Sequence, residues 1–240
     1  MTFHRPHHQR IAIVLKALNS SLLKSHHCYF GGGTAIALRH GEYRESVGID
    51  FMVSDLSHYR ALRELVREDN KISSLMNDLG KETFKFADVR QDQYGIRTKI
   101  GVVDSMIKFE IVLEGRIEFC KPSLADEILG VSTLSDLDLA SLKFLANSDR
   151  GHDTSTHCRD IIDLSMMNLT KPQLVSSVEK AKSAYGASVL ADFTKVVDML
   201  RTKENLLGKC LIAMQMKLPE AVVWQKIKKL QKTINKLNAG

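Results

Sequence analysis

Apolar side chains follow two different spacings along the first half of the chain. Near the start they recur every three or four positions, which predicts a helix over residues 9–23. A short strand over 28–30 and a helix over 34–40 are expected next, with a run of glycines between them. The run over 47–53 is apolar and partly β-branched, which indicates a buried strand.

The next segment mixes helical and extended patterns. We expect helices over 59–66 and 71–79, and strands within 84–103 and 106–114. In the last strand, one face carries Ile107, Phe109, Ile111 and Leu113, and the other carries Lys108, Glu110 and Val112. Such alternation is typical of a strand with one buried face.

From Asp136 onward the pattern is helical. Pro122 and the sequence GVST indicate a boundary within 121–135. We therefore predict an α/β (α+β) domain over residues 1–130 and a helical C-terminal domain over 131–240.

Composition narrows the class of protein. The 240 residues are 44% hydrophobic and 26% charged, which is typical of a soluble globular protein. A net charge of +6 makes a polyanionic partner such as RNA plausible. The four cysteines are far apart and indicate reduced thiols. No apolar run approaches the ~20 residues of a membrane span, and the N-terminus lacks a signal core, so we expect a cytoplasmic protein without membrane contact.

The glycine run is the first candidate for chemistry. Glycine lets the backbone approach phosphate oxygens closely, and the N-terminus of a following helix favours an anion. The run matches neither the P-loop nor the dinucleotide fingerprint. A tight strand-to-helix turn without ligand is the alternative.

Two acids lie inside apolar strands. Asp50 and Glu110 are both flanked by core-type residues, and carboxylates on neighbouring strands are candidate Mg²⁺ ligands. A capped or salt-bridged aspartate at a strand end is the alternative for Asp50. A second acid two positions before Asp50 would point to the same face, but that position is Gly48.

The motifs FGGGTAIALRHGEYRES, IDFMVSD, IKFEIVLEGR and LKFLANSDRGHDTSTHCRDIIDL together resemble the AbiEii/AbiGii-like nucleotidyltransferase toxins of abortive-infection and type IV toxin–antitoxin systems. The resemblance covers most of residues 28–165. It implies a polymerase-β-like minimal nucleotidyltransferase fold, a mixed sheet with flanking helices. It also implies transfer of a nucleoside monophosphate from an NTP to RNA, with tRNA in several branches, or to protein. Mg²⁺ or Mn²⁺ would be the cofactor, and a cognate antitoxin a partner.

The resemblance assigns roles residue by residue. As nucleotide-binding residues it implies Gly32, Gly33, Thr34, Arg44, Ser46 and Lys143. As catalytic residues it implies Asp50, Glu110, Lys143, Asp160 and Asp163, with Asp50 and Glu110 as metal ligands. Alternatives remain open: Lys143 as a solvated helix lysine, and Arg159 as an ion-pair partner of Asp160 or Asp163.

Gly48 stands where the family pattern has aspartate. Losing one acid of a metal site should lower turnover by orders of magnitude. Either the chain is a degenerate member kept for binding nucleotide or RNA, or an active toxin has acquired a change through cloning or design. The other motif residues are intact, which favours the second explanation. A non-catalytic interaction module is a third hypothesis.

Two further patterns are less specific. Near the C-terminus an apolar seam at heptad-like spacing consists of Val223, Ile227, Leu230, Ile234 and Leu237. The lysines off this seam form either a solvated basic face or a surface that follows an RNA backbone, with Trp224 as an anchor. The N-terminal histidines are expected to be exposed, since no cysteine or acid completes a metal site in the sequence.

Overall fold

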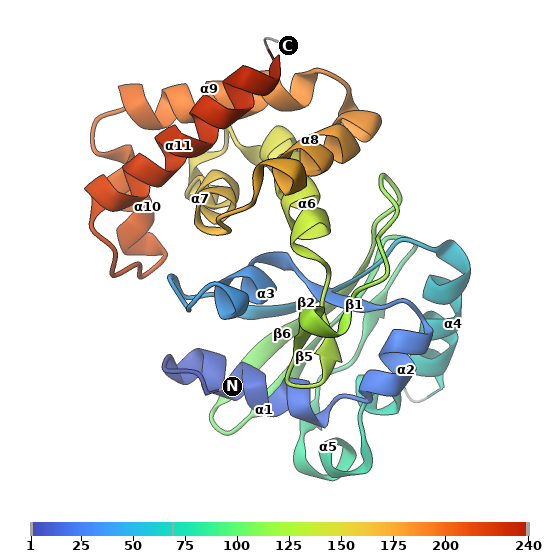
Figure 1. The fold of residues 1–240 in the computed structure, drawn as a ribbon. Helices are drawn as coiled ribbons and strands as arrows, with labels where there is room; N and C mark the ends of the chain where they lie inside the picture. Colours follow the sequence, from blue (N-terminus) through green and yellow to red (C-terminus); the bar gives the residue numbers. More distant parts are fainter. Residues whose placement is uncertain (1, 69, 239–240) are drawn as a thin grey trace. The chain divides into compact units, whose positions relative to one another are not determined.

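The computed structural model describes residues 2–68 and 70–238, and the chain divides into two compact units (Figure 1). A mixed unit holds the residues up to Glu42 and Ser46–Ser135, and a helical unit holds Tyr43–Glu45 and the residues from Asp136 onward. The division falls after the predicted residue 130, because the short strands β7 (Glu127–Ile128) and β8 (Val131–Ser132) pair with each other within the mixed unit.

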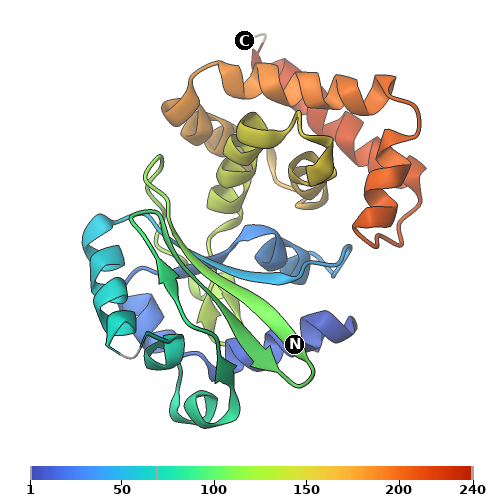
Figure 2. The same cartoon turned by 180° about the vertical axis from the view of Figure 1, so that it is seen from behind.

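The mixed unit is built on one sheet with the strand order β1-β2-β6-β5-β3, and β4 also pairs with β5. The strands are β1 (Tyr29–Gly31), β2 (Gly48–Val53), β3 (Lys85–Phe86), β4 (Arg90–Gln91), β5 (Gly95–Val102) and β6 (Ser105–Leu113). The β2–β6 pair is parallel and the other pairs are antiparallel, so the sheet is mixed as predicted. Figure 2 shows the long β5–β6 hairpin from behind.

One face of this sheet forms the core. Phe51 of β2 packs beside Phe30 and Phe109, with ring centroids 5.6 Å apart in each pair. Ile107 and Ile111 of β6 are buried on the same face, which confirms the predicted alternation. The opposite face is more open and carries the polar positions of β2 and β6.

Helices and 3₁₀ turns surround the sheet. They are α1 (Pro6–Ala17), α2 (Ser20–Ser25), α3 (Gly32–Arg39), α4 (Leu56–Arg67), η1 (Ile72–Leu75), α5 (Asp78–Thr83) and η2 (Leu124–Asp126). The helix predicted over 9–23 is interrupted, because the Asn19 side chain accepts the Leu22 N–H at 3.0 Å and so starts α2. The helix predicted over 71–79 is likewise split, since Asn77 caps α5 through the Gly80 N–H.

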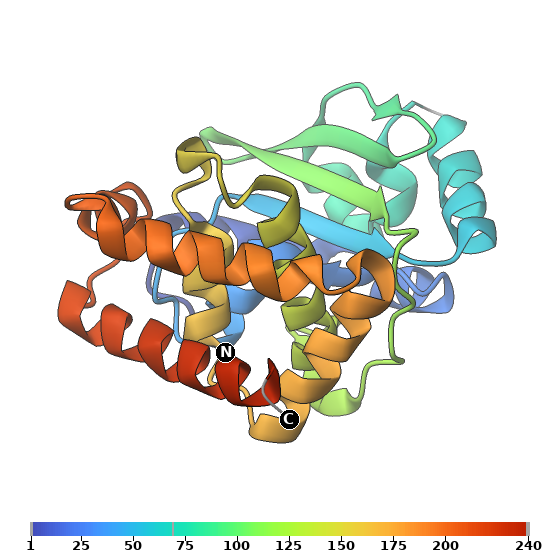
Figure 3. The same cartoon turned by 90° about the horizontal axis from the view of Figure 1, so that it is seen from above.

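The helical unit follows. Its elements are α6 (Asp136–Arg150), η3 (Thr154–Thr156), α7 (Arg159–Met166), α8 (Lys171–Tyr185), α9 (Ser188–Thr202), α10 (Leu206–Ala213) and α11 (Glu220–Asn238). Helix α6 packs against α7, α8 and α9, and α11 packs against α7 and α9 (Figure 3). Among the described residues, no helix combines the length and apolar character that a bilayer crossing requires.

Candidate active site

A row of facing residues crosses the open face of the sheet. Gly31 of β1 pairs with Asp50 of β2, Asp50 pairs with Glu110 of β6, and Glu110 pairs with Arg97 of β5. Residues directly opposite each other on paired strands project to the same face. The fold therefore brings together the two acids that the sequence singles out as metal ligands, beside the glycine run.

The glycine run turns directly against the Asp50 carboxylate. Gly32 opens α3 with a φ of +68°, a conformation that L side chains rarely adopt. A Cβ at Gly32 would lie 2.7 Å from Asp50 Oδ2, which is too close for any side chain. Both facts require glycine here. The start of α3, which includes the half-buried Gly33, therefore lies next to the carboxylate.

Two hydroxyls lie at the start of β2, the strand that carries Asp50. The Thr34 hydroxyl donates to the Gly48 carbonyl at 2.5 Å and lies 2.8 Å from the Ser46 hydroxyl. Thr34 is fully buried, whereas Ser46 is half-buried. Thr34 thus holds the start of β2 in place, which is a structural task that the sequence did not indicate.

Gly48 has room for a side chain. A Cβ built there would lie 3.6 Å and 3.8 Å from the two carboxylate oxygens of Asp50, which is ordinary van der Waals contact. Its φ is not among the positive values of the chain. An aspartate at this position would therefore fit and would place its carboxylate beside that of Asp50.

Glu110 is held by two cations. Arg97 Nε lies 2.6 Å from Oε1 and Lys108 Nζ lies 2.5 Å from Oε2. The side chains of these partners are 37% and 58% exposed, so the pairs are surface pairs that contribute little to stability. Arg97 also binds Asp92 at 2.9 Å. Sequence reasoning missed Arg97, because only the β5–β6 register brings it to Glu110.

The carboxylates of this row fit one cation rather than two. Among the described residues, no group of three or more histidine, cysteine or acidic side chains forms a metal site. Two neighbouring carboxylates suit a Mg²⁺ ion, which keeps several waters and also binds substrate phosphates. A two-metal arrangement would need a further acid, and position 48 is where the backbone has room for it.

The helical unit contains a separate, buried ion network centred on Asp163 of α7. Arg44 contacts both carboxylate oxygens, at 2.6 Å and 2.9 Å, and Tyr43 donates its hydroxyl at 2.5 Å. Lys143 of α6 lies 2.6 Å from Asp163 and 2.8 Å from Asp160. The segment Tyr43–Glu45 is thereby part of the helical unit, although its neighbours in sequence belong to the mixed unit.

Electrostatics keep this network ionised. Burial by itself raises the pKa of the Asp163 carboxyl, but the charges of Arg44 and Lys143 outweigh it and hold that pKa well below its ordinary value. The pKa of Asp160 is lowered in the same way, against the effect of burial, by Lys143 and Arg150. Arg150 lies 2.9 Å from Asp160 and was not identified from the sequence.

These contacts test the two alternative interpretations of Lys143 and Arg159. Lys143 is buried and paired, so it is not a solvated helix lysine. The acids of α7 pair with Arg44, Lys143 and Arg150, whereas Arg159 is exposed. The interpretation of Arg159 as their partner was therefore wrong, because α7 turns both acids inward.

The expectation that the N-terminal histidines are exposed was wrong for His8. Its side chain is fully buried, its Nδ1 lies 2.8 Å from Glu42 Oε1, and its Nε2 accepts the Ser46 N–H at 3.1 Å. His7 Nε2 lies 3.0 Å from the Val47 carbonyl. The N-terminal segment thus braces the residues that lead into β2.

The predicted seam of the last helix is confirmed for most of its length. Val223, Ile227, Leu230 and Ile234 of α11 are buried, and Leu237 is half-buried. Lys228 lies over the Trp224 ring at 5.8 Å, which makes that ring part of a cation–π pair.

The comparisons with known proteins agree with this architecture. The family model described as nucleotidyl transferase AbiEii toxin of a type IV toxin–antitoxin system matches residues 13–227. A proposed nucleotidyltransferase from Helicobacter pylori has a TM-score of 0.53 and 17% identity, over 96% of each chain. JHP933 from Helicobacter pylori has a TM-score of 0.55 and 16% identity, over 99% of this chain and 97% of its own.

A third structure, the nucleotidyltransferase toxin MenT4 of Mycobacterium tuberculosis, has a TM-score of 0.49 and 15% identity, over 96% of this chain and 86% of its own. No curated protein sequence matches the chain. At these identities the two Helicobacter pylori structures show a shared fold, and the family model carries the assignment. Because that model spans most of the chain, the chain belongs to the AbiEii family of nucleotidyltransferase toxins.

Proposed function

We propose that this chain is a Mg²⁺-dependent nucleotidyltransferase whose acceptor is RNA, with tRNA as the first candidate, and that Gly48 leaves it weak or inactive. Mn²⁺ could replace Mg²⁺, and protein is the alternative acceptor. Under this proposal the toxin acts in the cytoplasm and a cognate antitoxin neutralises it, as the type IV description of the family implies.

One observation carries the proposal. The Asp50 carboxylate lies against two glycines: a Cβ at Gly32 would collide with it, and a Cβ at Gly48 would only touch it. A buried strand that contributes only structure has no need for an aspartate in such contact with a left-handed glycine. The arrangement suits an anion at the start of α3 and a cation at Asp50.

The chemistry is a displacement at the α-phosphorus of the NTP. A bond forms from the acceptor hydroxyl oxygen to phosphorus, the bond to the β-phosphate oxygen breaks, and the hydroxyl proton is lost to solvent or base. The N–H groups at the start of α3 and the Ser46 hydroxyl would bind phosphate oxygens, while Asp50 and Glu110 would hold the metal. A Mg²⁺ ion bound there would neutralise triphosphate charge and lower the pKa of the attacking hydroxyl.

The helical network has a part in this proposal. Arg44, Lys143 and Arg150 surround the carboxylates of Asp160 and Asp163, and the charge of Asp149 also acts on Arg150. Arg150 is 38% exposed and can donate to an external group. We assign the acids to holding the cations in place, and we carry over the roles of Lys143 and Arg44 as nucleotide-binding residues from the family motif.

A second function is favoured by the state of Glu110. Its carboxylate is already paired with Arg97 and Lys108, and Gly48, two positions before its register partner Asp50, supplies no carboxylate. A chain in this state would bind nucleotide or RNA without transferring anything, as a pseudoenzyme.

The deciding experiment compares the chain with its Gly48→Asp variant. Each is incubated with the four labelled NTPs, Mg²⁺ and total cellular RNA, and label in RNA and in protein is followed. We expect Gly48→Asp to transfer label at least about 10³-fold faster, since metal stabilisation is worth several kcal/mol. The labelled species would identify the acceptor.

Two controls separate charge from structure. Gly48→Asn has nearly the same shape without the negative charge and should stay inactive. Gly48→Asp combined with Asp50→Asn should lose the gained activity. If Gly48→Asp folds, binds NTP and transfers no label to either acceptor, the enzyme proposal fails and the pseudoenzyme takes its place.

A further inference from the structure

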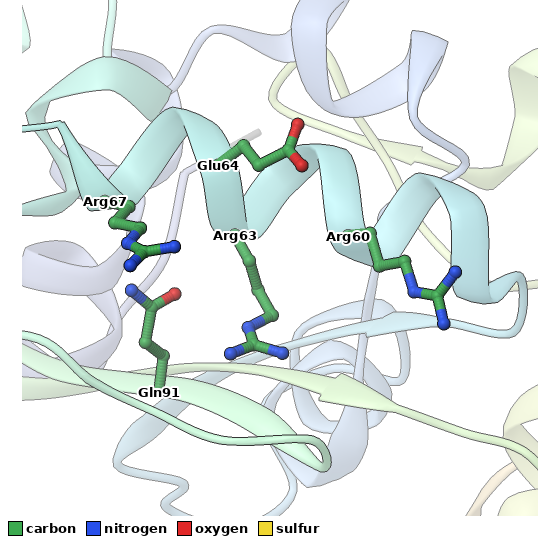
Figure 4. Close-up of a pocket in the computed structure, with 5 residues that line it drawn as sticks. All are labelled: Arg60, Arg63, Glu64, Arg67 and Gln91. Atoms are coloured by element: carbon green, nitrogen blue, oxygen red, sulfur yellow. The ribbon is translucent and has the colours of Figure 1, made fainter.

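A cavity of about 420 Å³ lies in the mixed unit, away from the carboxylate row. It is lined by Arg60, Arg63, Glu64, Arg67 and Gln91. The first four come from α4 and the last from β4. Figure 4 shows the three arginines reaching to the side of α4 where Gln91 stands, while the Glu64 carboxylate points away from them.

Among the described residues that line this cavity, three positive charges stand against one acid, Glu64. In the described part of the chain, none of the three arginines takes part in an ion pair. Glu64 has helical spacing to both Arg60 and Arg67, yet it pairs with neither. Grouping guanidinium ions along one helix face is electrostatically unfavourable, so the arrangement implies an external anion.

Two buried polar atoms in the cavity lack partners. Arg63 Nε is a donor without an acceptor, and Gln91 Oε1 is an acceptor without a donor. The Arg63 guanidinium also lies 5.9 Å from the Tyr59 ring centroid, which fixes its position. Both atoms have almost no accessible surface, so they meet a ligand only when the two side chains turn outward. The free-energy cost of a buried polar atom without a hydrogen bond favours that turn.

The dimensions favour a chain of phosphates over a single ion. Arg60 and Arg67 are separated by about 10 Å along the helix axis. Phosphates of a nucleic-acid strand advance by about 3.4 Å each along a duplex, so this row matches several of them. Gln91 Oε1 needs a donor, which the 2′-hydroxyl of RNA supplies and the sugar–phosphate backbone of DNA does not.

The cavity is separate from the carboxylate row. Gln91 pairs with Ile96 of β5, and Ile96 is buried in the core face. Arg97, the next residue, projects to the opposite face with Glu110. A triphosphate at Asp50 would therefore not reach these arginines, and their ligand must be a different part of the substrate or a different molecule.

We propose that α4 and β4 form a binding site for the phosphodiester backbone of RNA, with Arg60, Arg63 and Arg67 contacting phosphates and Gln91 a 2′-hydroxyl. The site extends the proposed function. It rests on that function because the RNA bound here is taken to be the acceptor of the transfer. Binding a remote part of the acceptor would then position its reacting end.

The test measures binding of a short fluorescent single-stranded RNA to the full chain by anisotropy, over a series of salt concentrations. Arg60→Gln/Arg67→Gln is compared with Lys85→Gln/Lys121→Gln, which removes the same charge from exposed positions of the same unit. We expect the arginine variant to bind about tenfold or more weakly. Its salt dependence, log K against log salt concentration, should become shallower by roughly 1.4.

A second variant tests the same site while keeping all three arginines. Gln91→Glu places a carboxylate opposite them, so RNA affinity should fall while the thermal midpoint does not. DNA of the same sequence should bind the unaltered chain more weakly than RNA, and inorganic phosphate or NTP should displace RNA only at high concentration. Equal loss in the lysine control, equal affinity for DNA, or displacement by low NTP would each overturn the proposal.

The outcomes also separate this site from the proposed function. Arginine-dependent RNA binding by a Gly48→Asp chain that transfers no label would leave the site standing and remove the enzyme. Transfer to RNA with the same KM for RNA in the arginine variant and in its control would overturn the site alone.

Discussion

The carboxylate row of the sheet and the ion network of the helical unit use the same residue types in opposite ways. Asp50 and Glu110 lie on an open face, and Glu110 pairs only with partly exposed cations. Asp160 and Asp163 are buried, and three cations contact them at hydrogen-bond distance. The carboxylates of the sheet lie where an external ligand can approach them. The ion pairs of the buried carboxylates instead hold α6, α7 and the segment Tyr43–Glu45 together.

The difference shows why a motif residue is not by its identity a catalytic one. Lys143 and Arg44 match the family pattern as triphosphate ligands, yet their charges are committed to Asp163 and Asp160. Arg150, which is 38% exposed, is the cation through which the network reaches solvent. The two regions should therefore respond differently to substitution.

The largest difference should appear in stability. Asp163→Asn leaves Arg44 and Lys143 buried without full compensation and should lower the free energy of unfolding by about 3–5 kcal/mol. Glu110→Gln removes only surface pairs and should change it by about 1 kcal/mol or less. Urea denaturation of both variants measures the contrast. Similar losses in the two variants would mean that the sheet row is structural too.

Lowering the pH should reduce the stability of the helical unit first, by protonating Asp160 and Asp163. The folded-state pKa values of Asp160 and Asp163 lie below their unfolded values, so their contribution is present above about pH 4 and is lost as pH falls below that value. The single tryptophan, Trp224, lies in α11 of the helical unit, and its fluorescence can follow thermal unfolding as a function of pH. The thermal midpoint should fall steeply below about pH 4.

The Asp163→Asn variant serves as the control for this acid effect. It has already lost one of the two carboxylates, so its thermal midpoint should fall less over the same pH range. An equally steep fall in that variant would assign the acid sensitivity to groups outside the network.

The smallest effects concern the two glycines beside Asp50. Gly48→Ala should stabilise the chain by about 0.5–1 kcal/mol, since the added Cβ makes ordinary contacts and the φ is allowed. Gly32→Ala should destabilise it by about 1–3 kcal/mol, because its φ is positive and its Cβ would collide with Asp50. Thermal unfolding of the pair checks both signs. A stable Gly32→Ala would contradict the close approach of α3 to Asp50.

Local patterns were enough to predict most elements of the chain. The alternation along β6 identified its buried face, and the seam of α11 identified its packed positions. Side-chain caps produced the main errors, since Asn19 and Asn77 each begin a new helix where apolar spacing alone predicts continuation.

Some residues of the candidate site could be recognised from the sequence, and others could not. Asp50 and Glu110 stood out because an acid in an apolar strand is visible in the sequence. Arg97, Arg150 and His8 did not stand out, since their partners lie far away in the sequence and nothing in their own segments distinguishes them. The row Arg60–Arg67 was not singled out from the sequence, because only the tertiary structure places Gln91 of β4 opposite it.

The sequence by itself determined the order of elements, the mixed sheet followed by helices, and the family, because these depend on periodicity and on motifs contiguous in the chain. Only the tertiary structure decided which charges meet. Strand register aligned Gly31, Asp50 and Glu110, and helix packing closed Asp163 among cations. Ion pairs act over a few ångströms, and those distances are set by packing between segments that are remote in sequence.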